Sequence, residues 1–236
     1  MSESLLPAPQ LVINSRMIYS SWIPADPAAA AALLPRGLEP AANHAVYMNQ
    51  YVVDSAEQTS GFGAYSLTYL GVDLGRFTAP DGATPARFFT HYLNSSELMR
   101  SYVLERGVPA APGSTTVDVK GGKLVATTSV DGSPVIRTVA KAGKKIGAVA
   151  QGHLTYVTRL GRKLVAGNYA YIGEIAESFE LLSLEFLVEE GHPLWALRPA
   201  QPLQPVPAWC WFAPRDSFVY PGGEQELRVQ SLRKAA

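Results

Sequence analysis

ERGVPAAPG, the sequence of residues 105–113, ends one helical pattern and opens a long run of strand patterns. Upstream of it, Asn94 and Glu97 have the spacing of a capping box, which predicts a helix of about ten residues. Gly107 is a typical residue just after a helix end, and Pro109 cannot continue a helix. The stretch therefore separates a helix from the strands that follow it.

Two hairpins are predicted directly after this stretch. Residues 114–120 and 123–130 alternate between apolar and polar side chains, and the glycine pair at 121–122 suits a two-residue turn between them. The Asp-Gly pair at 131–132 is a second such turn and leads into residues 133–139. Three successive antiparallel strands are therefore expected here.

Strand patterns also dominate the rest of the chain. They occupy residues 11–22, 45–53, 64–72, 86–93, 153–160, 163–172, 175–189 and 208–219. A second short helix is predicted at residues 28–34, with Asp26 as its N-cap and Pro27 as its first residue. The fold class is therefore mainly β, with a predominantly antiparallel sheet that closes on itself or forms a sandwich.

Composition favours one globular domain. The chain has 236 residues, 47% of them hydrophobic, and a formal net charge of zero. We expect a single domain over residues 1–236, with flexible termini at 1–9 and 222–236. The balanced charge gives no reason to expect nucleic acid or a membrane as partner. The acidic, proline-broken start does not resemble a signal peptide, so a cytoplasmic location is expected.

No metal or cofactor is expected from the sequence. The four histidines are dispersed without the paired spacing of metal ligands. No dinucleotide or phosphate-binding fingerprint occurs. The single cysteine, Cys210, is flanked by tryptophans, which favours an inert buried thiol.

The order of several short pieces resembles the acetoacetate decarboxylase superfamily. These pieces are RMIYSSWIPAD at 16–26, LLPRGLEP at 33–40, GFGAY at 61–65, YLN at 92–94 and GVP at 107–109. The resemblance covers roughly residues 10–220. It implies a cone-like antiparallel β-barrel that encloses an apolar pocket, and it implies a homo-oligomer.

The positions that carry the family's chemistry are altered. In the family, a lysine forms a Schiff base with a β-keto acid, and a second lysine beside it lowers its pKa. The resemblance places this pair at Ala110 and Ala111, and alanine cannot form an imine. Two pocket glutamates correspond to Asn49 and Leu67, whereas the family's arginine is kept as Arg16. A lysine-dependent decarboxylase is therefore not expected.

The candidate site residues follow from the same correspondence. Arg16 could hold a substrate carboxylate or enolate oxygen, with a structural ion pair as the alternative. Asn49 could orient a carbonyl or hydroxyl group, or be a satisfied interior amide. Gln50 should point to the opposite face of its strand. Ala110 and Ala111 are expected to line the substrate pocket.

Four further residues are candidates on their chemistry. His91 and His153 lie on predicted strands, and either could act as a general acid or base near neutral pH, although strand histidines are more often structural. Tyr65 and Tyr92 could orient a substrate through their hydroxyl groups, or pack in the core.

Three hypotheses about function remain open. The first is an enzyme of secondary metabolism, lyase-like, that performs lysine-independent dehydration, cyclisation, isomerisation or hydrolysis on a small carbonyl or polyketide-like molecule. The second is a non-catalytic protein that binds a small molecule. The third is a Schiff-base decarboxylase or aldolase whose lysine is recruited from Lys141, Lys144, Lys145 or Lys163.

Overall fold

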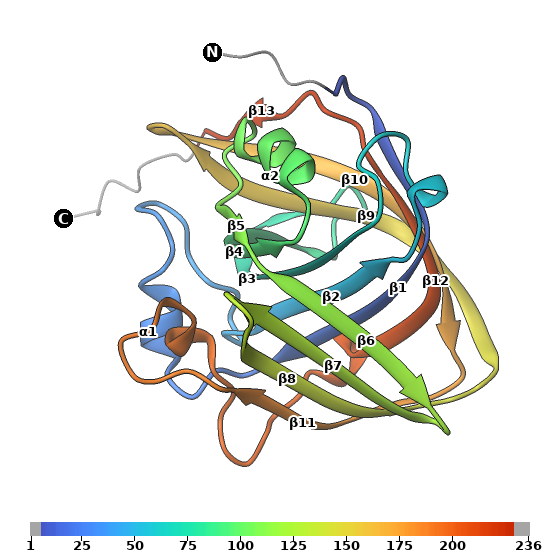
Figure 1. The fold of residues 1–236 in the computed structure, drawn as a ribbon. Helices are drawn as coiled ribbons and strands as arrows, with labels where there is room; N and C mark the ends of the chain where they lie inside the picture. The colour runs from blue at the N-terminus through green and yellow to red at the C-terminus, as the bar shows by residue number, and fades with distance from the viewer. Residues whose placement is uncertain (1–5, 229–236) are drawn as a thin grey trace.

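Strands form most of the molecule, as predicted (Figure 1). The structure, a computed structural model, describes residues 6–228. The larger sheet contains β1 (Gln10–Trp22), β2 (Val46–Val53), β3 (Tyr65–Thr78), β4 (Pro85–Asn94), β5 (Ala110–Pro112), β9 (Ile146–Leu160), β10 (Lys163–Ala176), β12 (Trp211–Tyr220) and β13 (Gln225–Glu226). The smaller sheet contains β6 (Ser114–Lys120), β7 (Lys123–Val130), β8 (Ser133–Ala142) and β11 (Phe179–Phe186). The helices are α1 (Pro27–Ala31) and α2 (Glu97–Leu104), with short 3₁₀ turns at Ala56–Gln58, Pro193–Leu197 and Pro207–Trp209.

The larger sheet closes into a ring. Its strands pair in the order β12, β1, β2, β3, β4, β9 and β10, and β10 pairs again with β12 from Tyr171↔Phe218 to Glu174↔Arg215. The pairs are antiparallel except where β4 meets β9 and β5, so the sheet is mixed and departs there from the antiparallel expectation. Closure leaves the barrel strands with few free edges.

Strand β2 shows how the barrel divides its side chains. Tyr47 and Tyr51 belong to the aromatic cluster inside the ring, whereas Val46 and Met48 belong to a second cluster on the other face. Successive side chains of a strand point to opposite faces of the sheet, so every second residue lies on the same face. Both faces are buried because the smaller sheet lies across the outside of the barrel (Figure 1).

A chain of hydrogen bonds joins the two sheets. Gln50 Nε2 donates to Thr128 Oγ1 at 2.9 Å and Gln50 Oε1 accepts from Thr138 at 2.7 Å. Thr68 Oγ1 lies 2.6 Å from Thr128 Oγ1 and 2.7 Å from Thr115 Oγ1. All five side chains are almost completely buried. Gln50 therefore points away from the barrel interior, as predicted.

The hairpin turns have the predicted glycines. Gly121 and Gly122 have φ angles of 62° and 83° and join β6 to β7. Asp131 and Gly132 have φ angles of 49° and 77° and join β7 to β8. These positive φ angles suit a two-residue hairpin turn.

Helix α2 begins later than the sequence predicts. Ser96 is its N-cap and accepts from the Met99 amide at 3.2 Å, while Asn94 instead accepts from the Ser96 amide. The reason is local: the Asn94 side chain closes a turn at the end of β4 before the helix begins. Gly107 follows the helix with a φ of 74°, as expected of a residue just after a helix end.

The C-terminal part of the described chain contacts the barrel. β13 pairs with β10, and the Leu227 amide donates to the Leu164 carbonyl at 2.8 Å. Glu224 accepts from the Tyr156 hydroxyl at 2.6 Å and pairs with Arg106 at 3.2 Å. Residues 222–228 thus make specific contacts with the barrel, and the expectation of flexible termini stays a prediction. Residues 1–5 and 229–236 lie outside the described residues.

Candidate active site

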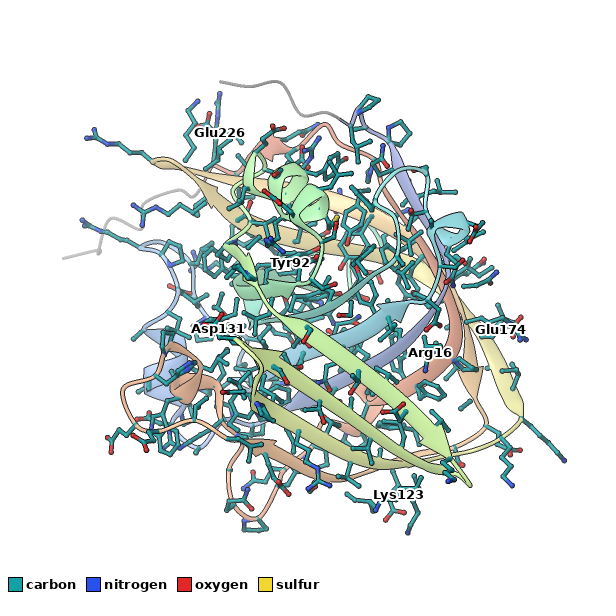
Figure 2. The ribbon with its side chains drawn as sticks, in the orientation of Figure 1. Arg16, Tyr92, Lys123, Asp131, Glu174 and Glu226 are labelled. Atoms are coloured by element: carbon teal, nitrogen blue, oxygen red, sulfur yellow. The ribbon has the colours of Figure 1, made fainter. Side chains whose placement is uncertain are left out.

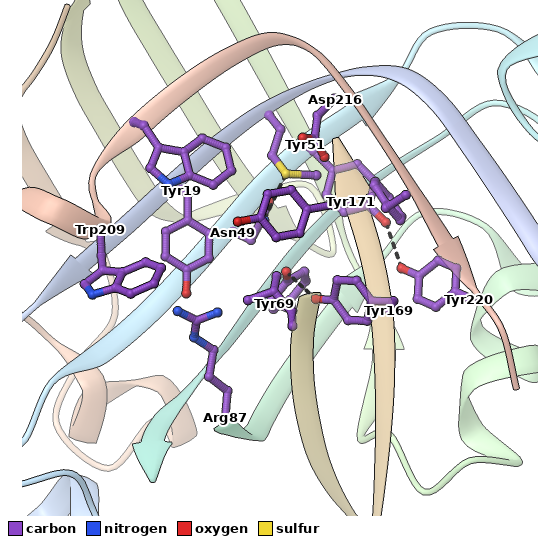
Figure 3. A pocket seen from close by; sticks show the side chains of 14 residues that line it. Tyr19, Asn49, Tyr51, Tyr69, Arg87, Tyr169, Tyr171, Trp209, Asp216 and Tyr220 are labelled. Carbon is purple, nitrogen blue, oxygen red and sulfur yellow. Dashed lines mark hydrogen bonds between the residues drawn. The ribbon is translucent and has the colours of Figure 1, made fainter. Parts of the chain in front are cut away.

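A cavity lies inside the barrel, and aromatic side chains form most of its wall (Figure 3). The space between atoms is about 430 Å³, including the part that opens to solvent. The lining residues come from the ring strands and from the segment before β12: Met17, Tyr19, Asn49, Tyr51, Tyr69, Arg87, Leu154, Tyr169, Tyr171, Trp209, Trp211, Asp216, Phe218 and Tyr220. A water-sized sphere can occupy only about 20 Å³ of this space, so side chains of the wall must move to admit a molecule larger than water.

Arg87, on β4, is the basic residue of the cavity. Its side chain is buried, and its Nε donates to Asp73 Oδ1 at 3.1 Å. The guanidinium carbon lies 4.9 to 5.1 Å from the ring centres of Tyr19, Tyr47 and Trp209. These contacts fix the guanidinium plane. Nη1 is buried and has no hydrogen-bond partner within residues 6–228.

Asp216, on β12, is the acidic residue of the cavity. It is 1% exposed, and its Oδ1 has no partner among the described residues. Burial raises the pKa of this carboxyl group to about 8, so it is protonated at neutral pH. Gly173, opposite on β10, makes room for it, since a Cβ atom there would overlap Oδ1. A buried carboxyl group of this kind can donate a proton and later accept one.

Asn49, predicted from the resemblance, lines the cavity. Its Nδ2 donates to Met17 Sδ at 3.1 Å, and its Oδ1 is buried without a partner in the described part of the chain. In Figure 3 the side chain lies between Arg87 and Asp216. It is therefore placed to accept a hydrogen bond from a bound molecule.

Tyr65 and Tyr92 lie one hydrogen bond behind the cavity wall. The Tyr65 hydroxyl is 2.8 Å from that of Tyr51, and the Tyr92 hydroxyl is 3.3 Å from that of Tyr220. Tyr51 and Tyr220 line the cavity and lie 3.2 Å apart. Burial raises the pKa of each of these phenols above its ordinary value, so they keep their protons. Tyr65 and Tyr92 therefore support wall residues rather than forming the wall.

Arg16 lies outside this cavity, contrary to the expectation from the resemblance. Its Nε and Nη2 donate to Asp54 at 2.9 and 2.6 Å, and Nη1 donates to the Val117 carbonyl, so the arginine joins β1 to the smaller sheet (Figure 2). Its side chain is 34% exposed. The structural ion pair is thus the alternative that the geometry supports.

Neither candidate histidine reaches the cavity. An irregularity in the pairing of β3 with β4 leaves Thr90 as an extra residue between Phe89 and His91. Such a bulge reverses the faces on which the following side chains lie. Phe89 remains inside the barrel, whereas His91 lines a separate groove beside Pro109, and burial lowers the pKa of His91 to about 4. His153 is exposed on β9.

Ala110 and Ala111, at the positions of the family's lysine pair, point in different directions. Ala110 packs against the aromatic cluster inside the barrel, and Ala111 packs against the second cluster outside it. Neither is among the residues lining the cavity. All lysines of residues 6–228 are exposed, and two of the four proposed replacements, Lys141 and Lys163, pair with Glu180 and Glu226.

The described residues form no cluster of three or more metal-ligating side chains. Their helices include none long and apolar enough to cross a membrane.

The sequence analysis did not identify Arg87 or Asp216 as site residues, although a pattern in the sequence marks each of them. Arg87 lies two residues before Phe89, and Asp216 two residues before Phe218. A charged side chain that shares the apolar face of a strand is a candidate for a buried function. The resemblance drew attention to Arg16 instead.

Comparison with solved structures identifies the fold. No protein-family model and no curated protein matches the chain. Solved structures match over nearly its whole length. The enduracididine biosynthesis enzyme MppR with HEPES buffer bound has a TM-score of 0.67 at 15% identity and covers 98% of this chain and 91% of its own.

Two further structures carry the family's name. Acetoacetate decarboxylase from Legionella pneumophila subsp. pneumophila str. Philadelphia 1 has a TM-score of 0.68 at 12% identity, covering 97% of this chain and 90% of its own. An acetoacetate decarboxylase-like enzyme from Sphingomonas wittichii RW1 has a TM-score of 0.64 at 15% identity, covering 95% of each. The chain therefore has the acetoacetate decarboxylase-like fold, as its sequence suggested.

Proposed function

We propose that the protein is an enzyme that acts on a small carbonyl compound in the barrel cavity without forming an imine. One observation carries this proposal: the unpartnered Nη1 of Arg87 and the unpartnered Oδ1 of Asp216 are both buried in the wall of the same cavity. Buried polar groups are normally hydrogen-bonded, and exceptions in native proteins are often functional. The two groups supply a fixed positive charge and an exchangeable proton.

The chemistry follows from these two groups. Arg87 Nη1 would donate to a substrate oxygen and stabilise negative charge that develops on it. Asp216, protonated at neutral pH, would donate a proton to the substrate, and its conjugate base would take one back. Asn49 Oδ1 would accept from a substrate hydroxyl. Dehydration, isomerisation, cyclisation and hydrolysis all use such a pair, so the reaction class stays open among them.

The lysines support the imine-free part of the proposal. Each lysine of the described chain is exposed, and none lines the cavity. A lysine forms imines readily when burial or a neighbouring cation lowers its pKa. The relatives in fold support the substrate class, since structures of MppR hold pyruvate, and the condensation product of pyruvate and imidazole 4-carboxaldehyde.

The test is a turnover screen. The protein is incubated with a panel of 2-oxo acids, β-keto acids and their aldehyde condensation products, and products are followed by NMR. We expect at least one compound to be converted, with conversion reduced at least a hundredfold in Asp216→Asn and unchanged in Asp118→Asn, a surface control. Borohydride treatment with the converted substrate should leave the protein mass unchanged. A lysine adduct would contradict the proposal.

A non-catalytic binding protein is the second candidate, and the aromatic wall of the cavity favours it as much as it favours an enzyme. It would bind one or more members of the panel with saturation but release no product from any of them. The relocated-lysine hypothesis would instead give a reducible adduct on Lys141, Lys144, Lys145 or Lys163.

Self-association is proposed as well, because the fold resemblance implies it. Leu11, Ile13 and Ile172 are 47%, 39% and 50% exposed and surround one shallow hollow on the outer face of β1, β10 and β12. We propose that a second copy of the chain covers this face. The cytoplasmic location and the role in secondary metabolism stay predictions.

A further inference from the structure

We infer that Trp209 is the gate of the barrel cavity, and that its indole ring selects by size the molecules that reach Arg87 and Asp216. This inference deepens the proposed function, on which it rests for the use of the cavity, by naming the residue that controls entry to that site. It concerns access alone, so its test needs neither a substrate nor a reaction.

The first step is that the cavity is closed. A water-sized sphere can occupy only about 20 Å³ of it, which is room for about one water molecule. The wall nevertheless contains two buried groups without partners in residues 6–228, Arg87 Nη1 and Asp216 Oδ1. A part of the wall therefore has to move before a larger molecule can reach them.

The second step is where the wall can open. The lining residues that are partly exposed are Leu154, Tyr171, Trp209, Trp211 and Tyr220. Four of them lie on β9, β10 and β12, whose backbones are held by pairing with neighbouring strands. Trp209 lies outside the strands, in the 3₁₀ turn Pro207–Trp209. In Figure 3 it lies at one end of the labelled side chains, beside Tyr19 and Arg87, so it forms an end wall of the cavity.

The third step is how this turn is attached to the barrel. Two groups that flank Trp209 bond the same acceptor on β1: the Val206 amide donates to the Ser21 carbonyl at 2.8 Å, and Cys210 Sγ donates to it at 3.4 Å. The Trp209 amide donates to the Val206 carbonyl at 2.9 Å, within the turn itself. The two residues that precede Trp209 are exposed. The indole ring can therefore turn outward into water while the backbone stays attached.

The fourth step is what holds the ring in its closed position. The Arg87 guanidinium carbon lies 5.1 Å from the centre of the indole ring, and the Tyr19 ring lies tilted against it at 6.4 Å. The indole N–H of Trp209 has no hydrogen-bond partner within residues 6–228, whereas that of the fully buried Trp22 donates to the Leu197 carbonyl at 2.9 Å. Outward movement of Trp209 thus breaks no hydrogen bond of the ring and uncovers Arg87 and Tyr19 together.

The position of the gate links entry to the chemistry. The closed ring rests on the same guanidinium group that would stabilise negative charge on the substrate. When the ring returns after entry, it restores this contact and separates the cavity from bulk water. Molecules that are too large for the ring to return over them would leave the site open.

The test measures access to a cysteine placed in the cavity wall. Met17 lines the cavity and is 5% exposed, and Cys210 is the chain's single cysteine. In the parent variant Met17→Cys with Cys210→Ser, where serine keeps the donor to the Ser21 carbonyl, intact mass follows the rate of labelling by methyl methanethiosulfonate. We expect Trp209→Ala to raise this rate at least tenfold, and Trp209→Phe to raise it by a smaller factor.

Trp195→Ala is the matched control. Trp195 also lies in a 3₁₀ turn and packs on an arginine, with the Arg198 guanidinium carbon 4.2 Å from its ring centre, but it does not line the cavity. It should leave the labelling rate within twofold of the parent. An unchanged rate in Trp209→Ala, or an equal rise in Trp195→Ala, would overturn the inference.

Two further measurements separate the gate from other causes. Labelling through the gate should not depend on low concentrations of urea, and a rate that rises steeply with urea would assign access to unfolding and overturn the inference. The gain from Trp209→Ala should be larger for the bulkier N-ethylmaleimide than for methyl methanethiosulfonate. Equal gains for the two reagents would overturn the selection by size.

The outcome is separable from that of the proposed function. Access controlled by Trp209, with no compound of the turnover panel ever converted, would uphold this inference and contradict the proposed enzyme. Conversion of a compound, together with labelling rates that Trp209 does not affect, would uphold the enzyme and overturn this inference.

Discussion

The carboxyl group of Asp216 is buried, and its burial makes the stability of the protein depend on pH. Its pKa is about 8 in the folded protein against 3.8 for the ordinary group. A group whose pKa is raised by folding contributes stability that is present below the unfolded pKa and is lost as the pH rises through the folded pKa. The protein should therefore lose stability between about pH 4 and pH 8.

The variant Asp216→Asn removes this dependence. Between pH 6 and pH 9 the wild type should lose about 3 kcal/mol more unfolding free energy than the variant, from the linkage between a carboxyl pKa and stability. Urea unfolding at several pH values measures the difference. Parallel pH profiles of the two proteins would show that Asp216 is ionised in the folded state at neutral pH.

The same ionisation should affect ligand affinity. Above pH 8 Asp216 gains a negative charge in a wall that otherwise presents one cation. Repulsion should then weaken the binding of an anionic member of the turnover panel, such as pyruvate, several-fold between pH 7 and pH 9 in the wild type, but not in Asp216→Asn. Calorimetric titrations at the two pH values check this. An affinity that falls equally in both proteins would assign the effect to another group.

Gly173 should be intolerant of a side chain because of Asp216. Gly173→Ala places a methyl group against Oδ1, and we expect a loss of about 1–3 kcal/mol in unfolding free energy from the overlap. In the double variant with Asp216→Ser, which shortens the opposing side chain, most of this loss should disappear. Chemical unfolding of the four proteins in this cycle measures the coupling. Additive effects would contradict the contact.

At the scale of elements, the attachment of the smaller sheet to the barrel depends on a polar chain. Thr128 Oγ1 accepts from Gln50 and bonds Thr68. Thr128→Val keeps the shape but leaves the Gln50 amide unpaired, which should cost about 1–3 kcal/mol. Thr127→Val is the control, since Thr127 is on the same strand, half-buried, on the other face. Similar losses in both variants would mean that the network contributes nothing measurable.

The elements also show what the sequence could and could not predict. Alternation along β2 correctly separated Asn49 from Gln50, and the glycines of the hairpins marked both turns. The bulge at Thr90 was not predictable, because an extra residue has no signature in an apolar strand, and it moved His91 out of the barrel. A second irregularity lies in β12, where Met17 pairs with Ala213 but Ser15 with Asp216. It brings Trp211 and Asp216 to the same cavity although they lie five positions apart, an odd offset that would otherwise place them on opposite faces of the strand.

Arg16 illustrates a different limit of prediction from sequence. The resemblance matched a residue type and a position, but the ion pair with Asp54 depends on a turn after β2 that no pattern in the sequence links to β1. Arg87 acquires its role only because Asp73, Tyr19 and Trp209 converge on it from three distant segments. Such convergence is a property of the closed barrel and cannot be read from one strand.

For the whole molecule, the outer apolar face should determine the oligomeric state. Ile172→Lys places a charge in the hollow between β1 and β12, and we expect it to shift the protein toward the monomer. Leu182→Lys is the control, because Leu182 is also exposed, at 43%, but lies on β11 in the smaller sheet. Light scattering after size exclusion measures the mass. A monomeric wild type would contradict the proposed self-association.

The pairing of β1 with β12 joins segments about two hundred residues apart, such as Val12 and Phe218. A growing chain on the ribosome therefore has no cavity until β12 has been made, because Asp216, Phe218 and Tyr220 all arrive with that strand. Until then β1 and β10 each present an open edge, which is a site for pairing with other chains. Nascent or truncated chains that end before residue 211 should thus be the forms that aggregate and depend on chaperones, and a ligand of the cavity could rescue only chains that have passed that point.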